Sequence, residues 1–161
     1  NRRLGLTNGA LLLLEHGTMA VRGYVGSSNY FRSELSGQVD GVRAKRSPGS
    51  ALKPFIYGLA LDQGLIHSET VLKDVAFSRS TYNPENFDRE FIGPIGAAEA
   101  LVRSRNIPAI ALANSLRSPS LYDFLRAAGI AGLREERSYG LALALGGVEV
   151  SPQEVAALYA M

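Results

Sequence analysis

Residues 46–64 of the chain read RSPGSALKPFIYGLALDQG, a group of turn-forming residues followed by a helical pattern. The apolar residues recur at the spacing i, i+3, i+4, i+7 and i+8, which is typical of a helix with one face in a hydrophobic core. They are Leu52, Phe55, Ile56, Leu59 and Ala60. Gly64 supplies a signal for the end of the helix. The stretch therefore predicts a core helix that begins near Ser50 and ends before Gly64.

Ser50 and Lys53 are one helical turn apart, so the lysine ammonium can reach the serine hydroxyl. A serine becomes a good nucleophile when an adjacent base takes its proton, and a lysine is such a base only where burial or a neighbouring cation lowers its pKa. The positive end of a buried helix would lower that pKa and stabilise an oxyanion. Alternatively, Ser50 caps the helix and Lys53 is an ordinary surface lysine. This motif alone leaves both interpretations open.

Length and composition favour one globular domain, since 161 residues can bury a substantial core. The net charge of +2 comes from dispersed arginines, which gives nucleic-acid binding little support. No cysteine is present, and the two histidines, His16 and His67, are far apart in the sequence without a nearby carboxylate cluster. We therefore expect no metal site, no cofactor and no Ser-His-Asp triad.

The pattern of the remaining chain predicts a mixed α+β fold that is mostly helical. Residues 10–15 are expected to form a buried strand, residues 16–18 a tight turn, and residues 19–26 the antiparallel partner of a β-hairpin. A hairpin is marginal by itself in water, so it should pack on helices or be completed by further strands.

Four further helices are expected in the second half of the chain. Pro94 could open the first, and Ser104-Arg105-Asn106 breaks it. The second begins near Ile107 and runs to Leu116, and the third runs from Leu121 to Ala128 after a cap at Ser118-Pro119. The last begins at a capping box, Ser151-Pro152-Gln153-Glu154, with proline at the first helical position.

Ser104-Arg105-Asn106 is the second candidate for chemistry. In an extended tripeptide the side chains of Ser104 and Asn106 can point the same way. In an acyl-transfer site such a hydroxyl could relay a proton to a leaving amine, while the amide holds a substrate peptide group. Alternatively, the tripeptide is a simple turn in which Asn106 caps the next helix.

Taken together, these motifs resemble a known family. A Ser-x-x-Lys motif followed by Ser-x-Asn is typical of penicillin-binding proteins and serine β-lactamases. Three longer strings resemble the transpeptidase domain of class A penicillin-binding proteins: RSPGSALKP at 46–54 with Tyr57-Gly58, YNPENFD at 82–88, and GGVEVSP at 146–152. The resemblance covers most of the chain, from the first expected strand onward. It implies the N-terminal part of a penicillin-binding or serine β-lactamase-like fold, with a β-hairpin packed on helices.

The resemblance also implies a role for each candidate residue. Ser50 would attack the penultimate D-alanine carbonyl of a peptidoglycan stem peptide, and its backbone N–H would form half of the oxyanion hole. Lys53 would be the general base for Ser50. Ser104 would pass a proton to the departing D-alanine, and Asn106 would hydrogen-bond the acyl-enzyme or Lys53. The implied partners are stem peptides and β-lactam antibiotics, and the implied location is the periplasmic side of a bacterial inner membrane.

One family motif does not occur: a Lys-Thr/Ser-Gly strand is absent from residues 1–161. We therefore expect residues 1–161 to be a single, partial transpeptidase domain without a glycosyltransferase domain. The missing C-terminal sheet strands would come from the rest of the protein or from a second chain, and the membrane anchor would lie outside this sequence.

Two other functions use the same residues. A serine β-lactamase would need a second base, commonly a glutamate in a Glu-x-x-x-Asn setting, and no glutamate after Asn106 has that setting. A penicillin-recognising sensor or scaffold could retain Ser50 and Lys53 without turnover. The sequence does not exclude this alternative.

Overall fold

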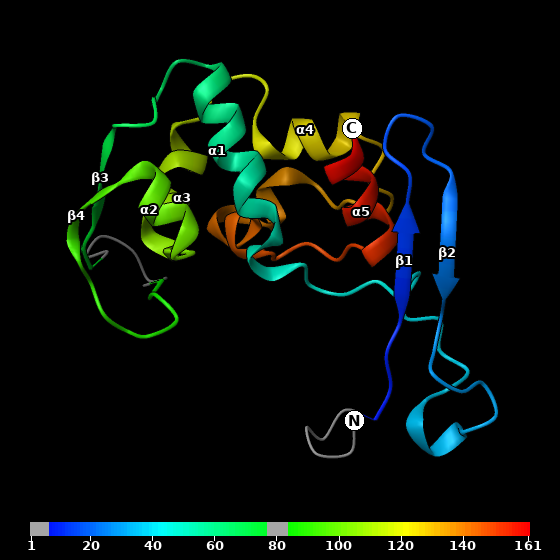
Figure 1. Cartoon of the computed structure of the whole chain (residues 1–161). Coiled ribbons are helices and arrows are strands. Elements are labelled where there is room, and N and C mark those ends of the chain that lie inside the picture. The colour runs from blue at the N-terminus through cyan, green and yellow to red at the C-terminus, as the bar shows by residue number, and fades with distance from the viewer. Residues whose placement is uncertain (1–6, 77–83) are drawn as a thin grey trace. The chain divides into compact units, whose positions relative to one another are not determined.

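The computed structural model describes residues 7–76 and 84–161, and its contacts divide the chain into two compact units. The first unit comprises residues 1–48 and 149–161 (Figure 1). It contains the strands β1 (Leu11–Leu14) and β2 (Val21–Val25), the 3₁₀ turn η2 (Ser33–Leu35) and the helix α5 (Pro152–Ala160).

The second unit comprises residues 49–148 and contains most of the helices. Its helices are α1 (Lys53–Asp62), α2 (Ala97–Val102), α3 (Asn106–Ser115) and α4 (Leu121–Ala127), and its strands are β3 (Val71–Asp74) and β4 (Gly93–Gly96). The 3₁₀ segments are η3 (Gly49–Leu52), η4 (Glu136–Ser138) and η5 (Gly140–Leu145).

The first unit contains the predicted hairpin. β1 and β2 pair antiparallel, with Leu11 opposite Val25 and Leu12 opposite Tyr24, and the turn falls at residues 16–18 as expected. The prediction that β1 is buried was wrong, because the side chains of Leu11 and Leu13 are 56% and 57% exposed. The four leucines alternate between two faces, and α5 lies beside β1 within this unit, so half of them stay uncovered (Figure 1).

The predicted capping box starts α5. The Ser151 hydroxyl accepts from the backbone N–H of Glu154, the Glu154 carboxylate accepts from that of Ser151, and Pro152 is the first helical residue. The preceding chain is fixed by an antiparallel bridge between Arg46 and Val150. These local contacts explain why the helix begins where the sequence predicted.

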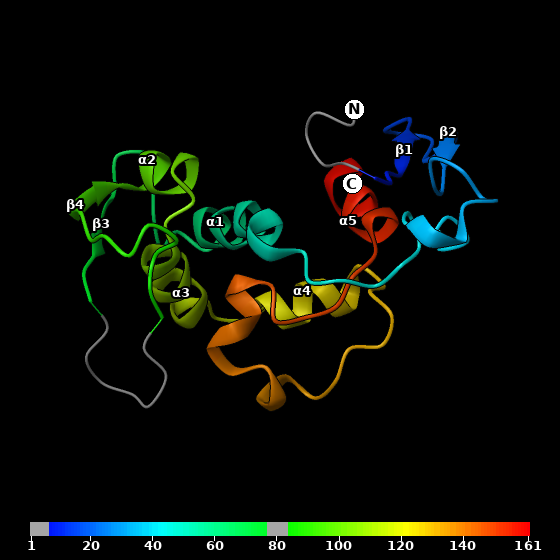
Figure 2. The ribbon, with the colours of Figure 1, turned by 90° about the horizontal axis from the view of Figure 1, so that it is seen from below.

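The core of the second unit lies between α1 and α3, which are side by side (Figure 2). α1 ends just before Gly64, which has a positive φ of 66°, as the sequence predicted. The buried side chains of the two helices meet the segment 140–145. They include Ile56, Leu59, Ile107, Ile110 and Leu112, and Leu52, at the end of η3 just before α1, is buried as well.

The region around Pro94 corrects the sequence-based prediction. Pro94 lies in β4, opposite Lys73 of β3, and the helix α2 begins only at Ala97. Proline lacks a backbone N–H, but an edge strand has one side on which no donor is needed. The pairing with β3 therefore overrides the helix-opening preference of proline.

Two smaller boundaries also differ. Ser120, and not Ser118-Pro119, caps α4 through a capping box with Asp123. The predicted turn at residues 81–88 lies partly outside the described residues, which resume at Pro84. Within the described ranges, every helix is too short or too polar to cross a bilayer.

Candidate active site

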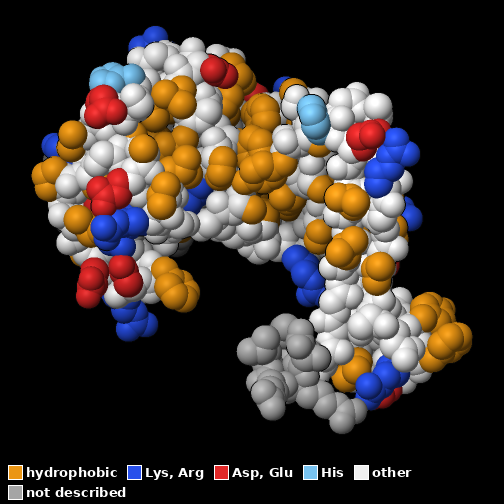
Figure 3. Space-filling view, viewed as in Figure 1, with side chains coloured by type: hydrophobic (Ala, Val, Ile, Leu, Met, Phe, Trp, Pro, Cys, Tyr) orange, Lys and Arg blue, Asp and Glu red, His pale blue; other side chains and the backbone are white. Residues whose placement is uncertain are grey.

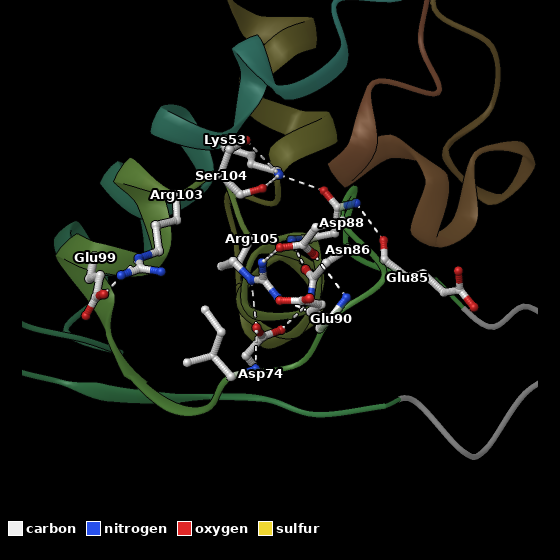
Figure 4. Close-up of polar contacts among 12 residues, drawn as sticks. Lys53, Asp74, Glu85, Asn86, Asp88, Glu90, Glu99, Arg103, Ser104 and Arg105 are labelled. Atoms are coloured by element: carbon white, nitrogen blue, oxygen red, sulfur yellow. Dashed lines mark hydrogen bonds and ion pairs between the residues drawn. The ribbon is translucent and has the colours of Figure 1, made fainter.

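Lys53 is the first residue of α1, and its side chain is only 1% exposed. Its ammonium donates to the carbonyl oxygen of Ser104 (2.5 Å), to the Ser104 hydroxyl (3.1 Å) and to the Asn106 side-chain oxygen (2.7 Å) (Figure 4). An ammonium has three hydrogens, so each of them has an acceptor. The two motifs that the sequence singled out, 51 to 53 residues apart, therefore meet at this nitrogen.

Ser50 lies in η3, the 3₁₀ turn that leads into α1, and it is exposed. It lines an open cavity of about 530 Å³ together with Ser104 and Asn106. Gly49, Phe87, Arg103 and Leu145 complete the lining. The structure thus gathers Ser50, Ser104 and Asn106 around one cavity, while the hydrogen bonds of Lys53 go to Ser104 and Asn106 and not to Ser50.

The end of α2 explains the position of Ser104. The N–H of Ser104 donates to the Leu101 carbonyl and the N–H of Arg105 to the Ala100 carbonyl, both at 2.9 Å. This pair of bonds is the Schellman motif, in which one residue adopts the left-handed conformation. Here that residue is Ser104, with a φ of 55°, although glycine is the usual choice. A non-glycine residue costs about 1–2 kcal/mol there, so the surroundings must hold it.

Asn106 does not cap its own helix, contrary to the alternative interpretation of the tripeptide. The cap position of α3 is Arg105, without a side-chain cap hydrogen bond, and Asn106 is the first helical residue. The Asn106 side chain accepts from Lys53 and donates to the Glu85 carbonyl at 2.7 Å. Its backbone N–H donates to the side-chain oxygen of Asn86 at 2.7 Å. Asn86 thus does the capping from a distance, and Asn106 faces Lys53.

Burial, together with the smaller effect of the positive charge of Arg105, lowers the pKa of Lys53 to about 8. A substantial fraction of Lys53 is therefore neutral near pH 8, which a proton acceptor must be. The sequence motif predicted a lowered pKa but not Arg105 as a cause. In the sequence, Arg105 is only the middle residue of Ser104-Arg105-Asn106, and no local pattern indicates that it is buried.

Comparison with known proteins gives consistent results. The family model described as the penicillin-binding protein transpeptidase domain matches residues 9–161. Penicillin-binding protein 1C of Escherichia coli, which the string at 48–64 resembles, is 43% identical over 151 residues, covering 93% of this chain and 20% of that protein. The chain thus spans about one fifth of the length of this relative.

Solved structures agree with the fold. Penicillin-binding protein 1A of Haemophilus influenzae aligns with a TM-score of 0.76 at 28% identity, over 95% of this chain and 23% of that one. PonA1 of Mycobacterium tuberculosis, solved in complex with penicillin V, has the same TM-score at 24% identity, over 96% and 43%. These likenesses confirm the predicted fold class, a helical α+β part of a transpeptidase fold.

Proposed function

The chain belongs to the family of penicillin-binding protein transpeptidase domains, and from this premise we propose that it carries the acylated serine of a peptidoglycan D,D-transpeptidase. One observation carries the proposal. Lys53, a buried lysine with a pKa of about 8, is hydrogen-bonded to Ser104 and Asn106, and these two residues line a cavity together with Ser50. A serine-based acyltransferase needs such a nucleophile and such a base.

The first step forms an ester between Ser50 Oγ and the carbonyl carbon of the penultimate D-alanine. Neutral Lys53 takes the hydroxyl proton, and the backbone N–H of Ser50 stabilises the oxyanion. The bond to the terminal D-alanine then breaks, and its nitrogen receives a proton through Ser104. The 3.1 Å contact between Lys53 Nζ and Ser104 Oγ supports this relay.

The second step transfers the acyl group from Ser50 to the amine of another stem peptide. In this step the amine loses a proton, and the Ser50 oxygen regains one as the ester bond breaks. Asn106, whose amide also contacts Lys53, would hold the acyl-enzyme. A β-lactam would acylate Ser50 in the same way when its ring amide opens. The comparisons do not favour the β-lactamase or sensor alternatives, because the relatives are class A penicillin-binding proteins.

The family membership supports three further parts of this proposal. The Lys-Thr/Ser-Gly strand, which residues 1–161 lack, would complete the site from outside these residues. The remaining strands of the sheet would come from the rest of the protein or from a second chain. The domain would act on the periplasmic side of the membrane, held by an anchor outside these residues.

The experiment that tests the proposal is an intact-mass measurement of the full-length protein after incubation with a penicillin. We expect one added penicillin mass, which peptide mapping places on Ser50. Ser50→Ala should abolish the adduct, and Ser68→Ala, which alters an exposed serine outside the site, should leave it unchanged. An adduct that persists in Ser50→Ala, or its absence from the unmodified protein, would contradict the proposal. Circular dichroism checks that Ser50→Ala is folded.

A further inference from the structure

Arg105 is a buried cation between the two functional residues Ser104 and Asn106, and it is only 5% exposed. Its guanidinium uses all three nitrogens: Nε donates to Asp74 Oδ2 at 2.7 Å, Nη1 to Asp88 Oδ2 at 2.6 Å, and Nη2 to the Glu90 carbonyl (Figure 4). A buried charge is tolerated when it is paired and hydrogen-bonded, and this guanidinium is paired with two carboxylates and donates from each of its nitrogens.

Asp74 connects Arg105 to a second side chain. Asp74 is fully buried at the end of β3, and its other oxygen accepts from Asn86 Nδ2 at 2.7 Å. The side-chain oxygen of Asn86 in turn accepts from the backbone N–H of Asn106 at 2.7 Å. The chain of contacts therefore leaves the tripeptide at Arg105 and returns to it at Asn106.

We propose that Arg105, Asp74 and Asn86 form a positioning clamp that holds Ser104 and Asn106 against Lys53. This inference rests on the proposed function of Lys53 as the base. None of the three clamp residues lines the cavity beside Ser50, so they act through the residues that do.

The clamp explains how an unfavourable turn persists. Ser104 has the left-handed conformation, and its carbonyl and hydroxyl both accept from Lys53. Arg105, the residue after the turn, is fixed by its side-chain hydrogen bond to Asp74. Asn106, the first residue of α3, is fixed by its backbone hydrogen bond to Asn86. Two anchors on one side of Ser104 and the end of α2 on the other leave the turn little freedom. A lysine at position 105 could not reproduce this, because an ammonium lacks the planar fork of a guanidinium.

The clamp also places a positive charge near the base. The charged or titratable groups on the elements around Lys53 include Tyr57, Asp62, Lys73, Asp74, Glu85, Asp88, Arg103 and Arg105. The charge of Arg105 lowers the pKa of Lys53. Removal of that charge should therefore raise the pKa of Lys53, and acylation would then need a higher pH.

The experiment measures the rate constant of penicillin acylation at Ser50 between about pH 6 and about pH 10 in the full-length protein. The rate should rise with pH as Lys53 loses its proton, with a midpoint near 8. In Arg105→Gln we expect the midpoint to move upward and the maximal rate to fall about tenfold to hundredfold. Arg105→Lys should keep the midpoint, since it keeps the charge, and lose maximal rate. Arg117→Gln, at an exposed arginine outside the site, should change neither.

Asn86→Ala is the second variant, since it cuts the contact to Asn106 without leaving a charge unpaired. We expect a lower maximal rate with an unmoved midpoint. Unchanged rates and midpoints in a folded Arg105→Gln protein, or an unchanged maximal rate in folded Asn86→Ala, would overturn the clamp. If the unmodified protein is not acylated at Ser50, the proposed function itself fails, and this outcome is distinguishable because it precedes any comparison of variants.

Discussion

The two strand pairs of this chain, β1–β2 and β3–β4, have the same local form and different consequences. Both are two-stranded and antiparallel. β1 and β2 are joined by a short turn and leave apolar side chains at the surface, as the space-filling view shows (Figure 3). β3 and β4 are separated by a long connection, and β3 ends at Asp74, which is fully buried beneath the site.

This difference separates structure that neighbouring residues determine from structure that distant residues determine. The first pair follows from a run of leucines and a short turn, which are neighbouring residues in the sequence. Its ion pair, Glu15 with Arg22, is exposed. The second pair is held by contacts between residues 12 to 31 positions apart, such as Asp74 with Asn86 and Arg105. The candidate site residue Asn106 depends on a contact of the second kind, since its backbone N–H donates to Asn86, 20 positions earlier in the chain.

The largest expected effect comes from a comparison of two paired carboxylates, the buried Asp74 of β3 and the exposed Glu15 next to β1. Asp74→Ala leaves the buried Arg105 without its inner partner, so it should lower the free energy of unfolding by about 3–5 kcal/mol. Glu15→Ala breaks an exposed pair and should change stability little. Urea denaturation followed by circular dichroism measures both. Equal losses in the two variants would mean that the buried pair is no more important than the surface one.

The apolar residues of the two pairs provide the second test. Ile95 of β4 is 3% exposed, whereas Leu13 of β1 is 57% exposed. Ile95→Ala should lower the free energy of unfolding by about 2–5 kcal/mol, because it leaves a cavity. The free energy of unfolding of Leu13→Ala should stay within about 0.5 kcal/mol of that of the unmodified chain. A larger loss for Leu13 would show that the hairpin is covered by a partner under the conditions of the measurement.

The smallest expected stability effect concerns two glycines with nearly the same φ, 85° at Gly146 and 82° at Gly129. A Cβ at Gly146 would lie 2.4 Å from the backbone nitrogen of Gly49, next to Ser50, whereas a Cβ at Gly129 would meet open space. Both alanine variants carry the same backbone strain. Gly146→Ala should therefore lower the free energy of unfolding by about 1–3 kcal/mol more than Gly129→Ala does.

The same pair of variants tests the site. Because the clash pushes on the turn that carries Ser50, penicillin acylation should fall about tenfold to hundredfold in Gly146→Ala. Gly129→Ala should keep its rate. Normal acylation by a folded Gly146→Ala protein would show that the Gly49–Leu52 turn tolerates displacement.

Several features of the fold were predictable because their causes lie within a few residues. The periodicity after Leu52, the stop at Gly64, the turn at 16–18 and the capping box at Ser151 are all local, and the structure confirms them. The failure at Pro94 has a distant cause. Pro94 favours a helix start by itself, but its pairing partner, Lys73, is 21 positions earlier in the chain.

The sequence by itself determined the residue types of the candidate site: a serine and a lysine at helical spacing, and a serine and an asparagine two positions apart. Only the tertiary structure decided which groups surround them. It buried Lys53 and placed Arg105 close enough to lower the pKa of Lys53, and it turned Asn106 toward Lys53 by letting Asn86 cap the helix. The physical reason is that burial and charge proximity depend on distances in space, and residues 50 positions apart have no fixed distance until the core between α1 and α3 forms.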